Sequence, residues 1–421
     1  MSVVSIVGAQ WGDEGKGRIV DYLAQRSDLV IRYQGGDNAG HTVVNEFGKF
    51  ALHIIPSGIF NDECCSIVGA GTVVNFDTMA HELEAIPKQL QENLFIDIRA
   101  HLIMPYHCLL DGAEEESRSG HWKVGTTKRG IGPCYSDKAS RCGLRAGDLN
   151  DPETFRTRLE MLLPKKNREL EFYGLRTFTI DELMEKAETW RERFGAKIID
   201  TLPLIRNAVE DGRNILMEGQ LGVMRDLDWG IYPYSTSSNP TSGGACNTGG
   251  IPAKALDEVI GVVKAYSTSV GGGPFVTELF DDDGKKMRDV GQEFGATTGR
   301  PRRCGWLDAV ALDYSAYLNG FTGLAITKLD ILDGFEKLKI CTAYRINGET
   351  YTQLPETRLQ EQAKPVYEEM DGWLCPTSSV RRWEDLPENA RRYLRRIEEL
   401  TRTPIRYVSV GPERDQIIVV P

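Results

Sequence analysis

The sequence predicts an α/β fold: a large, mostly parallel, twisted sheet flanked by helices. Two short apolar runs, Ser2–Val7 and Leu29–Gln34, are typical of buried strands. A glycine-rich loop, Gly8–Gly17, follows the first run, and Ile19–Arg26 has the spacing of a helix. A strand, loop, helix and second strand in this order form a βαβ unit, which favours parallel strands with ligands beyond their carboxyl ends.

The 421 residues have an ordinary composition for a folded protein, with 41% hydrophobic and 26% charged residues. The net charge of −11 argues against a nucleic-acid or anionic-membrane partner, because either would need a basic face. No apolar run reaches about 18 residues, and the short apolar segment before the first loop leads us to expect no signal peptide. The nine cysteines are scattered without a C-x-x-C pair. We therefore expect reduced thiols in a cytoplasmic protein, with no metal or redox site on cysteine.

The chain contains no internal repeat and no Pro/Ser-rich linker, so we expect a single continuous domain, 1–421. Residues 150–212 carry many charges of both signs and predict a helical insertion, with helices at Glu153–Leu163 and Asp181–Phe194. A strand at Asn214–Met217 should follow the insertion.

The C-terminal part predicts further helices and strands, including a hairpin and helical subdomain, 338–404. The predicted elements are helices at Pro252–Lys264 and Trp306–Leu318, a buried strand at Gly323–Thr327, a hairpin of Leu338–Asn347 and Glu349–Leu354 that turns at Asn347-Gly348, a helix at Leu386–Leu400, and closing strands at Arg406–Val410 and Gln416–Val420.

The loop Gly8–Gly17 is similar to a P-loop but departs from the Walker motif. Gln10 stands where the motif has its first glycine, and Gly17 stands where it has Ser or Thr. Successive backbone N–H groups at a helix N-terminus, together with Lys16, still predict an anion-binding cradle. Asp13 does not fit a plain phosphate cradle. A carboxylate there is repelled unless Mg²⁺ lies between it and the phosphate, or unless the carboxylate is a base. The alternative is a solvated surface turn.

The loop after the second strand offers a candidate catalytic histidine. His41 lies in GGDNAGHT with the polar neighbours Asn38 and Thr42. A lone histidine is usually structural, but this loop falls at the sheet edge where ligands bind, which makes a catalytic role about equally favoured.

Three later loops have residues suited to anionic ligands. Gly125–Pro133 is basic and glycine-rich with two threonines, and Ser235–Asn239 is a cluster of hydroxyls. Taken singly, each is more often an ordinary loop than a phosphate site. Gly295–Arg303 is more specific. Three arginines follow two threonines with no acidic residue among them, which favours carboxylate or phosphate recognition.

A final candidate is TKLD, Thr327–Asp330, at the end of an apolar strand. A carboxylate in that place accepts hydrogen bonds from N1–H and the exocyclic amine of guanine, a donor pair that adenine lacks. The tetrapeptide alone is a weak signal. The loop Gly8–Gly17, named here the phosphate-type loop, strengthens it.

Taken together, these motifs resemble the adenylosuccinate synthetase family. The resemblance runs collinearly from Val4 to about Val419 through GAQWGDEGKG, YQGGDNAGHT, GTTKRGIGP, YPYSTSSN, KAYSTSVGGGPFVTEL, GATTGRPRRCGWLD and TKLDILDG. It implies a P-loop-like GTP-binding architecture and a ligase that joins IMP and L-aspartate. GTP hydrolysis would drive the reaction through a 6-phosphoryl-IMP intermediate to adenylosuccinate, GDP and phosphate, as the first committed step of AMP biosynthesis. It also implies Mg²⁺ and a cytoplasmic homodimer.

The resemblance implies a role for each matching residue. Asp13 would be the base that removes the N1 proton of IMP and, with the Gly40 carbonyl, a ligand of Mg²⁺, while His41 would be an acid and hydrogen-bond donor on the transferred phosphoryl group. GTP would contact Gly12, Glu14, Gly15, Lys16, Gly17, Gly40, Thr42, Arg302, Lys328, Leu329, Asp330, Ser409, Val410 and Gly411. IMP would contact Asp13, Asn38, Ala39, Thr127, Gln220, Thr236, Arg300 and, from the neighbouring subunit, Arg141. Aspartate would contact Ala296, Thr297, Thr298, Arg300 and Arg302.

One segment departs from the family pattern. Members commonly read EGAQG or EGANA where this chain has Glu218-Gly219-Gln220-Leu221-Gly222, so that Leu221 aligns with the residue that contacts the six-position of the base. Either Gln220 substitutes or the contact is lost. An alternative function is therefore a related ligase that adds aspartate to another 6-oxopurine nucleotide such as GMP or dGMP. A third reading is a GTP-binding switch without ligase activity.

Overall fold

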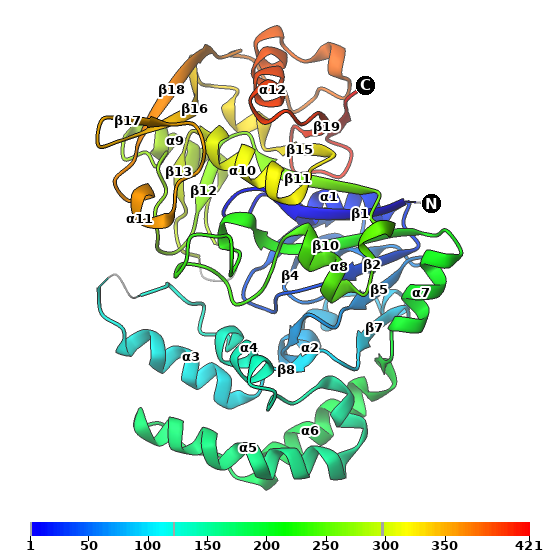
Figure 1. Ribbon diagram of the computed structural model, residues 1–421. Helices are drawn as coiled ribbons and strands as arrows, with labels where there is room; N and C mark the ends of the chain where they lie inside the picture. The colour runs from blue at the N-terminus through cyan, green and yellow to red at the C-terminus, as the bar shows by residue number, and fades with distance from the viewer. Residues whose placement is uncertain (1, 121–122, 296–298) are drawn as a thin grey trace.

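A ten-stranded sheet forms the centre of the computed structural model, which describes residues 2–120, 123–295 and 299–421 (Figure 1). Its strands are β1 (Ser2–Gly8), β2 (Leu29–Arg32), β5 (Cys65–Val68), β7 (Leu94–Asp97), β9 (Ile198–Ile199), β10 (Asn214–Gly222), β11 (Glu258–Lys264), β15 (Gly323–Thr327), β19 (Ile405–Ser409) and β20 (Ile417–Val419). Their order is β20-β19-β15-β11-β1-β10-β2-β5-β7-β9, and neighbours are parallel except for the pair β19–β20. The predicted α/β class is confirmed.

Helices cover both faces of this sheet because successive strand residues point to opposite sides. Ile6 of β1 packs with Ile19 of helix α1 (Lys16–Ala24) on one face. Val3 of β1 packs on the other face with Ala208 and Ala245, from helices α7 (Leu202–Glu210) and α8 (Ser242–Gly249). The strands therefore read as continuous apolar runs.

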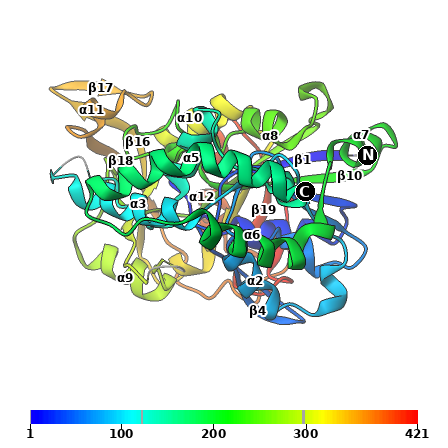
Figure 2. The same ribbon diagram turned by 90° about the horizontal axis from the view of Figure 1, so that it is seen from below.

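The predicted helices between 150 and 212 are confirmed as α5 (Pro152–Phe172) and α6 (Ile180–Phe194). Figure 2, which looks at the molecule from below, shows them as the layer nearest the viewer, beneath α3 (Pro105–Ser117). Phe155 and Trp190 from the two helices share a buried core with the β7 side of the sheet.

The remaining elements surround the sheet edges. They are β3 (His41–Asn45), β4 (Gly48–Leu52), β6 (Val73–Val74), α2 (Phe76–Glu84), β8 (His101–Leu102), α4 (Ile131–Ala139), β12 (Ser267–Ser269), α9 (Asp282–Gly291), β13 (Arg303–Gly305), β14 (Leu307–Asp308), α10 (Ala309–Asn319), β16 (Lys337–Ile346), β17 (Glu349–Tyr351), α11 (Thr357–Gln360), β18 (Lys364–Asp371) and α12 (Glu388–Thr401). The predicted C-terminal hairpin is confirmed by the antiparallel pair β16–β17.

The predicted helix at Pro252–Lys264 is wrong. A short 3₁₀ turn, Ala253–Ala255, is followed by the parallel strand β11 between β1 and β15. Val259, Ile260, Val262 and Val263 are buried there on both faces of the sheet. A short apolar run of this kind has no periodicity that separates a buried strand from a buried helix, and β-branching was the signal for a strand.

The nine cysteines are all unpaired. Among the described residues, no helix has both the length and the apolar character needed to span a bilayer.

Strand β1 lies between β10 and β11, while the chain itself continues to β2 on the far side of β10. The loop after β1 therefore lies in the middle of the sheet, at the edge where ligands of open α/β sheets bind.

Candidate active site

The loop after β1 is shaped from within by Glu14. This carboxylate is fully buried, and its Oε1 accepts hydrogen bonds from the backbone N–H of Gln10 (3.0 Å) and Gly12 (2.8 Å). Its Oε2 lies 2.6 Å from Nζ of Lys16, which is also buried. Gly15 then begins helix α1 with a left-handed backbone (φ 87°), as a glycine readily can. The side chain of Glu14 thus holds the loop and the lysine, which leaves only its backbone for a nucleotide.

Asp13 lies on the outer side of the same loop, at the wall of a cavity. Its Oδ2 accepts a hydrogen bond of 2.9 Å from Nε of Arg302, which comes from a segment far along the chain. The structure therefore brings the predicted base next to a predicted aspartate-binding arginine.

His41 lies against the phosphate-type loop because position 17 is glycine. A Cβ atom on Gly17 would lie 2.6 Å from Cδ2 of the His41 ring. On the other side of the ring, Nε2 lies 2.9 Å from Oγ of Ser57. Ser57 in turn donates from Oγ (2.9 Å) and from its backbone N–H (2.8 Å) to Glu218, which is buried in the middle of β10. Sequence analysis missed Ser57, for which no motif gave a signal.

The charges around His41 favour a neutral imidazole when no ligand is bound. Burial, and then the cation of Arg32, lower the pKa of His41 well below its ordinary value, while burial raises the pKa of Glu218. Since Ser57 gives its hydroxyl hydrogen to Glu218, Oγ accepts from Nε2–H of His41. Within the described residues Nδ1 of His41 has no hydrogen-bond partner. A phosphoryl oxygen near Nδ1 would favour protonation there, because a nearby negative charge stabilises the imidazolium.

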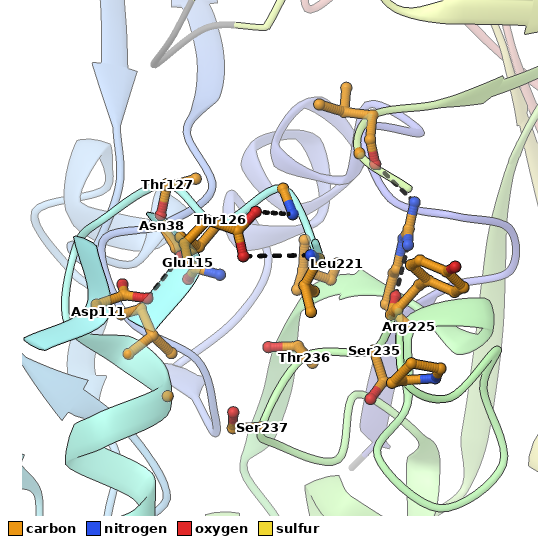
Figure 3. A pocket seen from close by; sticks show the side chains of 18 of the residues that line it. Asn38, Asp111, Glu115, Thr126, Thr127, Leu221, Arg225, Ser235, Thr236 and Ser237 are labelled. Carbon is orange, nitrogen blue, oxygen red and sulfur yellow. Dashed lines mark hydrogen bonds between the residues drawn. The ribbon is translucent and has the colours of Figure 1, made fainter. Parts of the chain in front are cut away.

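A cavity of about 460 Å³ opens beside the loop (Figure 3). Asn38 and Thr127 lie on one side of it, Ser235, Thr236 and Ser237 lie on the other, and Leu221 lies between them. Oδ1 of Asn38 is buried without a hydrogen-bond partner among the described residues. A buried polar atom of this kind at a cavity wall is suited to a ligand.

Two carboxylates on α3 position the segment that carries Thr127 (Figure 3). Asp111 accepts hydrogen bonds from Oγ1 of Thr126 (2.8 Å) and the backbone N–H of Gly130 (2.8 Å). Glu115 accepts from the backbone N–H of Gly125 (2.7 Å). These acidic side chains are committed to the loop.

The neighbouring side chains of Gln220 and Leu221 have different surroundings. The Gln220 amide is committed to backbone groups, since its Oε1 accepts from Gly36 N–H (3.0 Å) and its Nε2 donates to the carbonyls of Gly36 (2.8 Å) and Ala39 (3.0 Å). Leu221 has a left-handed backbone (φ 60°) and lines the cavity. The apolar residue of the pair therefore faces the ligand space, and Gln220 holds the loop that carries Asn38.

Arg225 stabilises the cavity wall that carries Ser235, Thr236 and Ser237. Sequence analysis missed this residue. Its guanidinium donates to the carbonyls of Tyr234 (2.5 Å) and Val270 (2.6 Å) and to Oγ of Ser269 (2.8 Å). Burial lowers the pKa of Arg225 to about 10. Its backbone carbonyl also accepts from Thr236 N–H (2.8 Å), so it connects two walls of the cavity.

The segments predicted to hold guanine lie beyond β15 and β19, on the other side of the loop. Lys328 has a left-handed backbone (φ 58°), Leu329 and Val410 are buried, and burial raises the pKa of Asp330. Arg18 of α1 reaches this place, donating to Oγ of Ser409 (2.7 Å) and to the carbonyl of Gly411. The predicted guanine-binding residues therefore adjoin the phosphate-type loop.

Other predicted site residues lie apart from the cavity or outside the described residues. Arg141, two residues after α4, and Thr42, on β3, are exposed, as is Arg300. Ala39 and Gly40 are partly exposed in the loop before β3. Ala296, Thr297 and Thr298 lie outside the described residues.

The oxygen donors of this site fit Mg²⁺. Magnesium keeps several waters and takes one or two carboxylates together with substrate phosphates, rather than an all-protein cage. The described residues contain no group of three or more His, Cys, Asp or Glu arranged around a metal. Asp13 and Gly40 offer a carboxylate and a carbonyl that are both partly exposed.

The fold and the loop define a class of protein: an α/β enzyme that binds a nucleotide's phosphates after the first strand of a parallel sheet. The profile of the adenylosuccinate synthetase family matches residues 5–418. The adenylosuccinate synthetase of Carboxydothermus hydrogenoformans is 50% identical over 424 residues, which covers 100% of this chain and 99% of that protein. The chain belongs to the adenylosuccinate synthetase family, whose members are GTP-dependent ligases that join IMP and L-aspartate.

Two solved structures share the fold. The fully ligated adenylosuccinate synthetase of Plasmodium falciparum superposes with a TM-score of 0.94 at 38% identity, covering 100% of both chains. The succinoaminodeoxyadenylate synthetase of cyanophage S-2L, bound to dGMP and to dATP as an energy donor, has a TM-score of 0.63 at 19% identity, covering 100% of this chain and 95% of that one. The second likeness concerns the fold alone.

Proposed function

We propose that this protein ligates L-aspartate to IMP with GTP hydrolysis, giving adenylosuccinate, GDP and phosphate through a 6-phosphoryl-IMP intermediate. The observation that carries the proposal is that Asp13 of the phosphate-type loop lines the cavity and accepts a hydrogen bond from Arg302. The family relation supports IMP as the acceptor nucleotide and GTP as the phosphoryl donor.

Asp13 takes the N1 proton of the hypoxanthine ring, which places negative charge on O6 and makes it a nucleophile toward the γ-phosphoryl group of GTP. Lys16 and the backbone N–H groups of the loop hold the phosphates, and His41 donates a hydrogen bond to the group in transfer. Mg²⁺, held by Asp13 and Gly40, would neutralise charge on the phosphates. The aspartate amine then displaces phosphate from C6, while Arg302 and Arg300 hold the aspartate carboxylates.

A steady-state assay with IMP, GTP, Mg²⁺ and L-aspartate tests the proposal, with GMP and dGMP as alternative acceptors. We expect formation of adenylosuccinate, detected by its absorbance, only with IMP. Turnover of GMP or dGMP in preference to IMP would support the related ligase. GTP binding without turnover of any acceptor would support a GTP-binding switch.

One observation favours the related ligase as the second candidate. Leu221 presents an apolar surface where the family commonly has an amide, and the Gln220 amide is bonded to Gly36 and Ala39. The side chains of Gln220 and Leu221 then offer no hydrogen bond to the six-position of the purine. The identity to adenylosuccinate synthetases over the full length supports IMP more strongly.

Asp330→Asn should change the preferred energy donor from GTP to XTP. An amide can donate to the 2-oxo group of xanthine but offers one acceptor fewer to guanine, so kcat/KM for GTP should fall by about 10²-fold. Kinetics with GTP and XTP at saturating IMP and aspartate measure this change. The matched control is Asp333→Asn, since Asp333 bonds to Trp373 and Thr377. An unchanged GTP preference in Asp330→Asn would contradict guanine recognition at this residue.

We further propose a cytoplasmic homodimer in which Arg141 reaches the IMP phosphate of the neighbouring subunit. The exposure of Arg141 away from its own cavity supports this arrangement. The chain is proposed to be one domain, 1–421, with 150–212 as a helical insertion and 338–404 as a C-terminal subdomain.

A further inference from the structure

Glu293 anchors the segment that carries the predicted aspartate-binding residues. It follows α9, where its backbone N–H donates to the carbonyl of Arg288 (2.9 Å) and its own carbonyl accepts from Arg302 N–H (2.9 Å). Phe294 and Pro301 pair as an antiparallel bridge just beyond. The backbone of Glu293 is therefore bonded both to the end of α9 and to Arg302.

The side chain of Glu293 is fully buried and makes four polar contacts. Its Oε1 accepts from Nζ of Lys328 (2.9 Å) and from the hydroxyl of Tyr266 (2.5 Å). Its Oε2 accepts from Nζ of Lys264 (2.8 Å) and from Nη1 of Arg302 (2.5 Å). Each of the two carboxylate oxygens thus accepts from two donors.

Two of these donors lead to different ligands. Lys328 begins the segment proposed to hold guanine, and it also donates to the carbonyl of Gly291 (2.6 Å). Arg302 continues through its Nε to Oδ2 of Asp13 (2.9 Å). A continuous line of contacts therefore runs from Lys328 through Glu293 and Arg302 to Asp13.

The charges make the carboxylate indispensable to this arrangement. Burial raises the pKa of Glu293, but the cations of Lys264, Lys328 and Arg302 outweigh burial and hold the pKa far below its ordinary value. Without the negative charge, three cations would face one another in a buried space, and Lys264 is itself fully buried. Lys328 and Arg302 would then move apart.

We infer that Glu293 is a positioning residue that couples guanine-nucleotide binding to aspartate binding, because one carboxylate fixes both Lys328 and Arg302. The inference rests on the proposed function, which makes Lys328 a guanine contact and Arg302 an aspartate contact. A nucleotide that holds Lys328 in place favours the bound position of Arg302. By reciprocity, aspartate favours tight nucleotide binding.

Glu293→Gln tests this coupling, because the amide keeps the shape of the side chain and removes its charge. Calorimetry would measure GDP affinity in the presence of IMP and Mg²⁺, with and without L-aspartate, a mixture in which no reaction proceeds. In the wild-type protein, aspartate should tighten GDP binding about fivefold or more. In Glu293→Gln that ratio should fall to one, and the KM for aspartate should rise about tenfold while the KM for IMP stays near its wild-type value.

The matched control is Asp308→Asn. Asp308 is also a buried carboxylate that accepts from a tyrosine, Tyr344 (2.7 Å), but it contacts no proposed site residue. It should keep the coupling. Should Glu293→Gln fail to fold, Tyr266→Phe removes one donor from the same carboxylate and should weaken the coupling in the same direction. Unchanged coupling in Glu293→Gln, or a KM for IMP raised as much as that for aspartate, would overturn the inference.

The same measurements separate this inference from the proposed function. A wild-type protein that joins no aspartate to IMP refutes the ligase assignment. Weaker GDP binding in Glu293→Gln than in the wild type would still support the contact between Glu293 and Lys328, and equal GDP binding would refute it.

Discussion

Asp13→Asn is expected to lower kcat by about 10⁴-fold, the upper end of the range for a general base. The amide keeps an oxygen that can accept the hydrogen bond from Nε of Arg302, so the wall of the cavity should survive. What disappears is the group that removes the N1 proton of the purine, together with one negative charge toward Mg²⁺. Steady-state kinetics with IMP, GTP and aspartate measure the loss.

Binding should be spared in this variant. GDP affinity measured without Mg²⁺ should change little, because the loop around Lys16 is held by Glu14 and not by Asp13. The control is Glu114→Gln, which removes a carboxylate from the same cavity at a residue with no proposed role. A variant of Asp13 that turned over at the rate of Glu114→Gln would remove Asp13 from the mechanism.

His41→Asn is expected to lower kcat about 10²–10³-fold, the cost of removing one donor from a transition state with developing charge. The effect is also a matter of protonation. Burial and Arg32 keep the pKa of His41 low in the free protein, so the ring is neutral near pH 7. Anionic phosphates beside the ring raise that pKa, and the nucleotide complex should therefore take up a proton.

Calorimetry of GDP binding in the presence of IMP, in two buffers of different ionisation enthalpy, detects that proton, which should be absent in His41→Asn. Ser57→Ala provides the graded comparison. It leaves the imidazole in place and removes the hydroxyl 2.9 Å from Nε2, so its loss of kcat should be smaller. Equal proton uptake in wild-type protein and His41→Asn would exclude His41 as the group that titrates.

The fold could be predicted from sequence wherever local pattern and tertiary role agree. The opening βαβ unit, the charged helices α5 and α6 and the hairpin at Asn347-Gly348 follow from spacing and turn chemistry alone. Strand β11 could not be placed, because its apolar run is buried on both faces and its neighbours β1 and β15 lie far along the chain. The β-branched residues favoured a strand, but only the pairing with these distant segments establishes one.

The candidate site shows the same limit. The glycine-rich loops and the arginine cluster indicated anion binding because several signals of one kind stood together. Ser57, Arg225 and Glu293 gave no such signal. Each is a single residue whose role lies in contacts across the fold, with His41, with the cavity wall and with Lys328. The opposite orientations of Gln220 and Leu221 also depend on the left-handed backbone at Leu221. This conformation favours glycine, so a leucine in the sequence gives no indication of it.

The carboxylate of Glu14 has a consequence for turnover. Loops that bind ligands are commonly mobile and close when the ligand binds. Here the Glu14 carboxylate accepts from the backbone N–H groups of Gln10 and Gly12 and forms an ion pair with Lys16 without any ligand. The cradle should persist between catalytic cycles, ready for the next nucleotide without an ordering step.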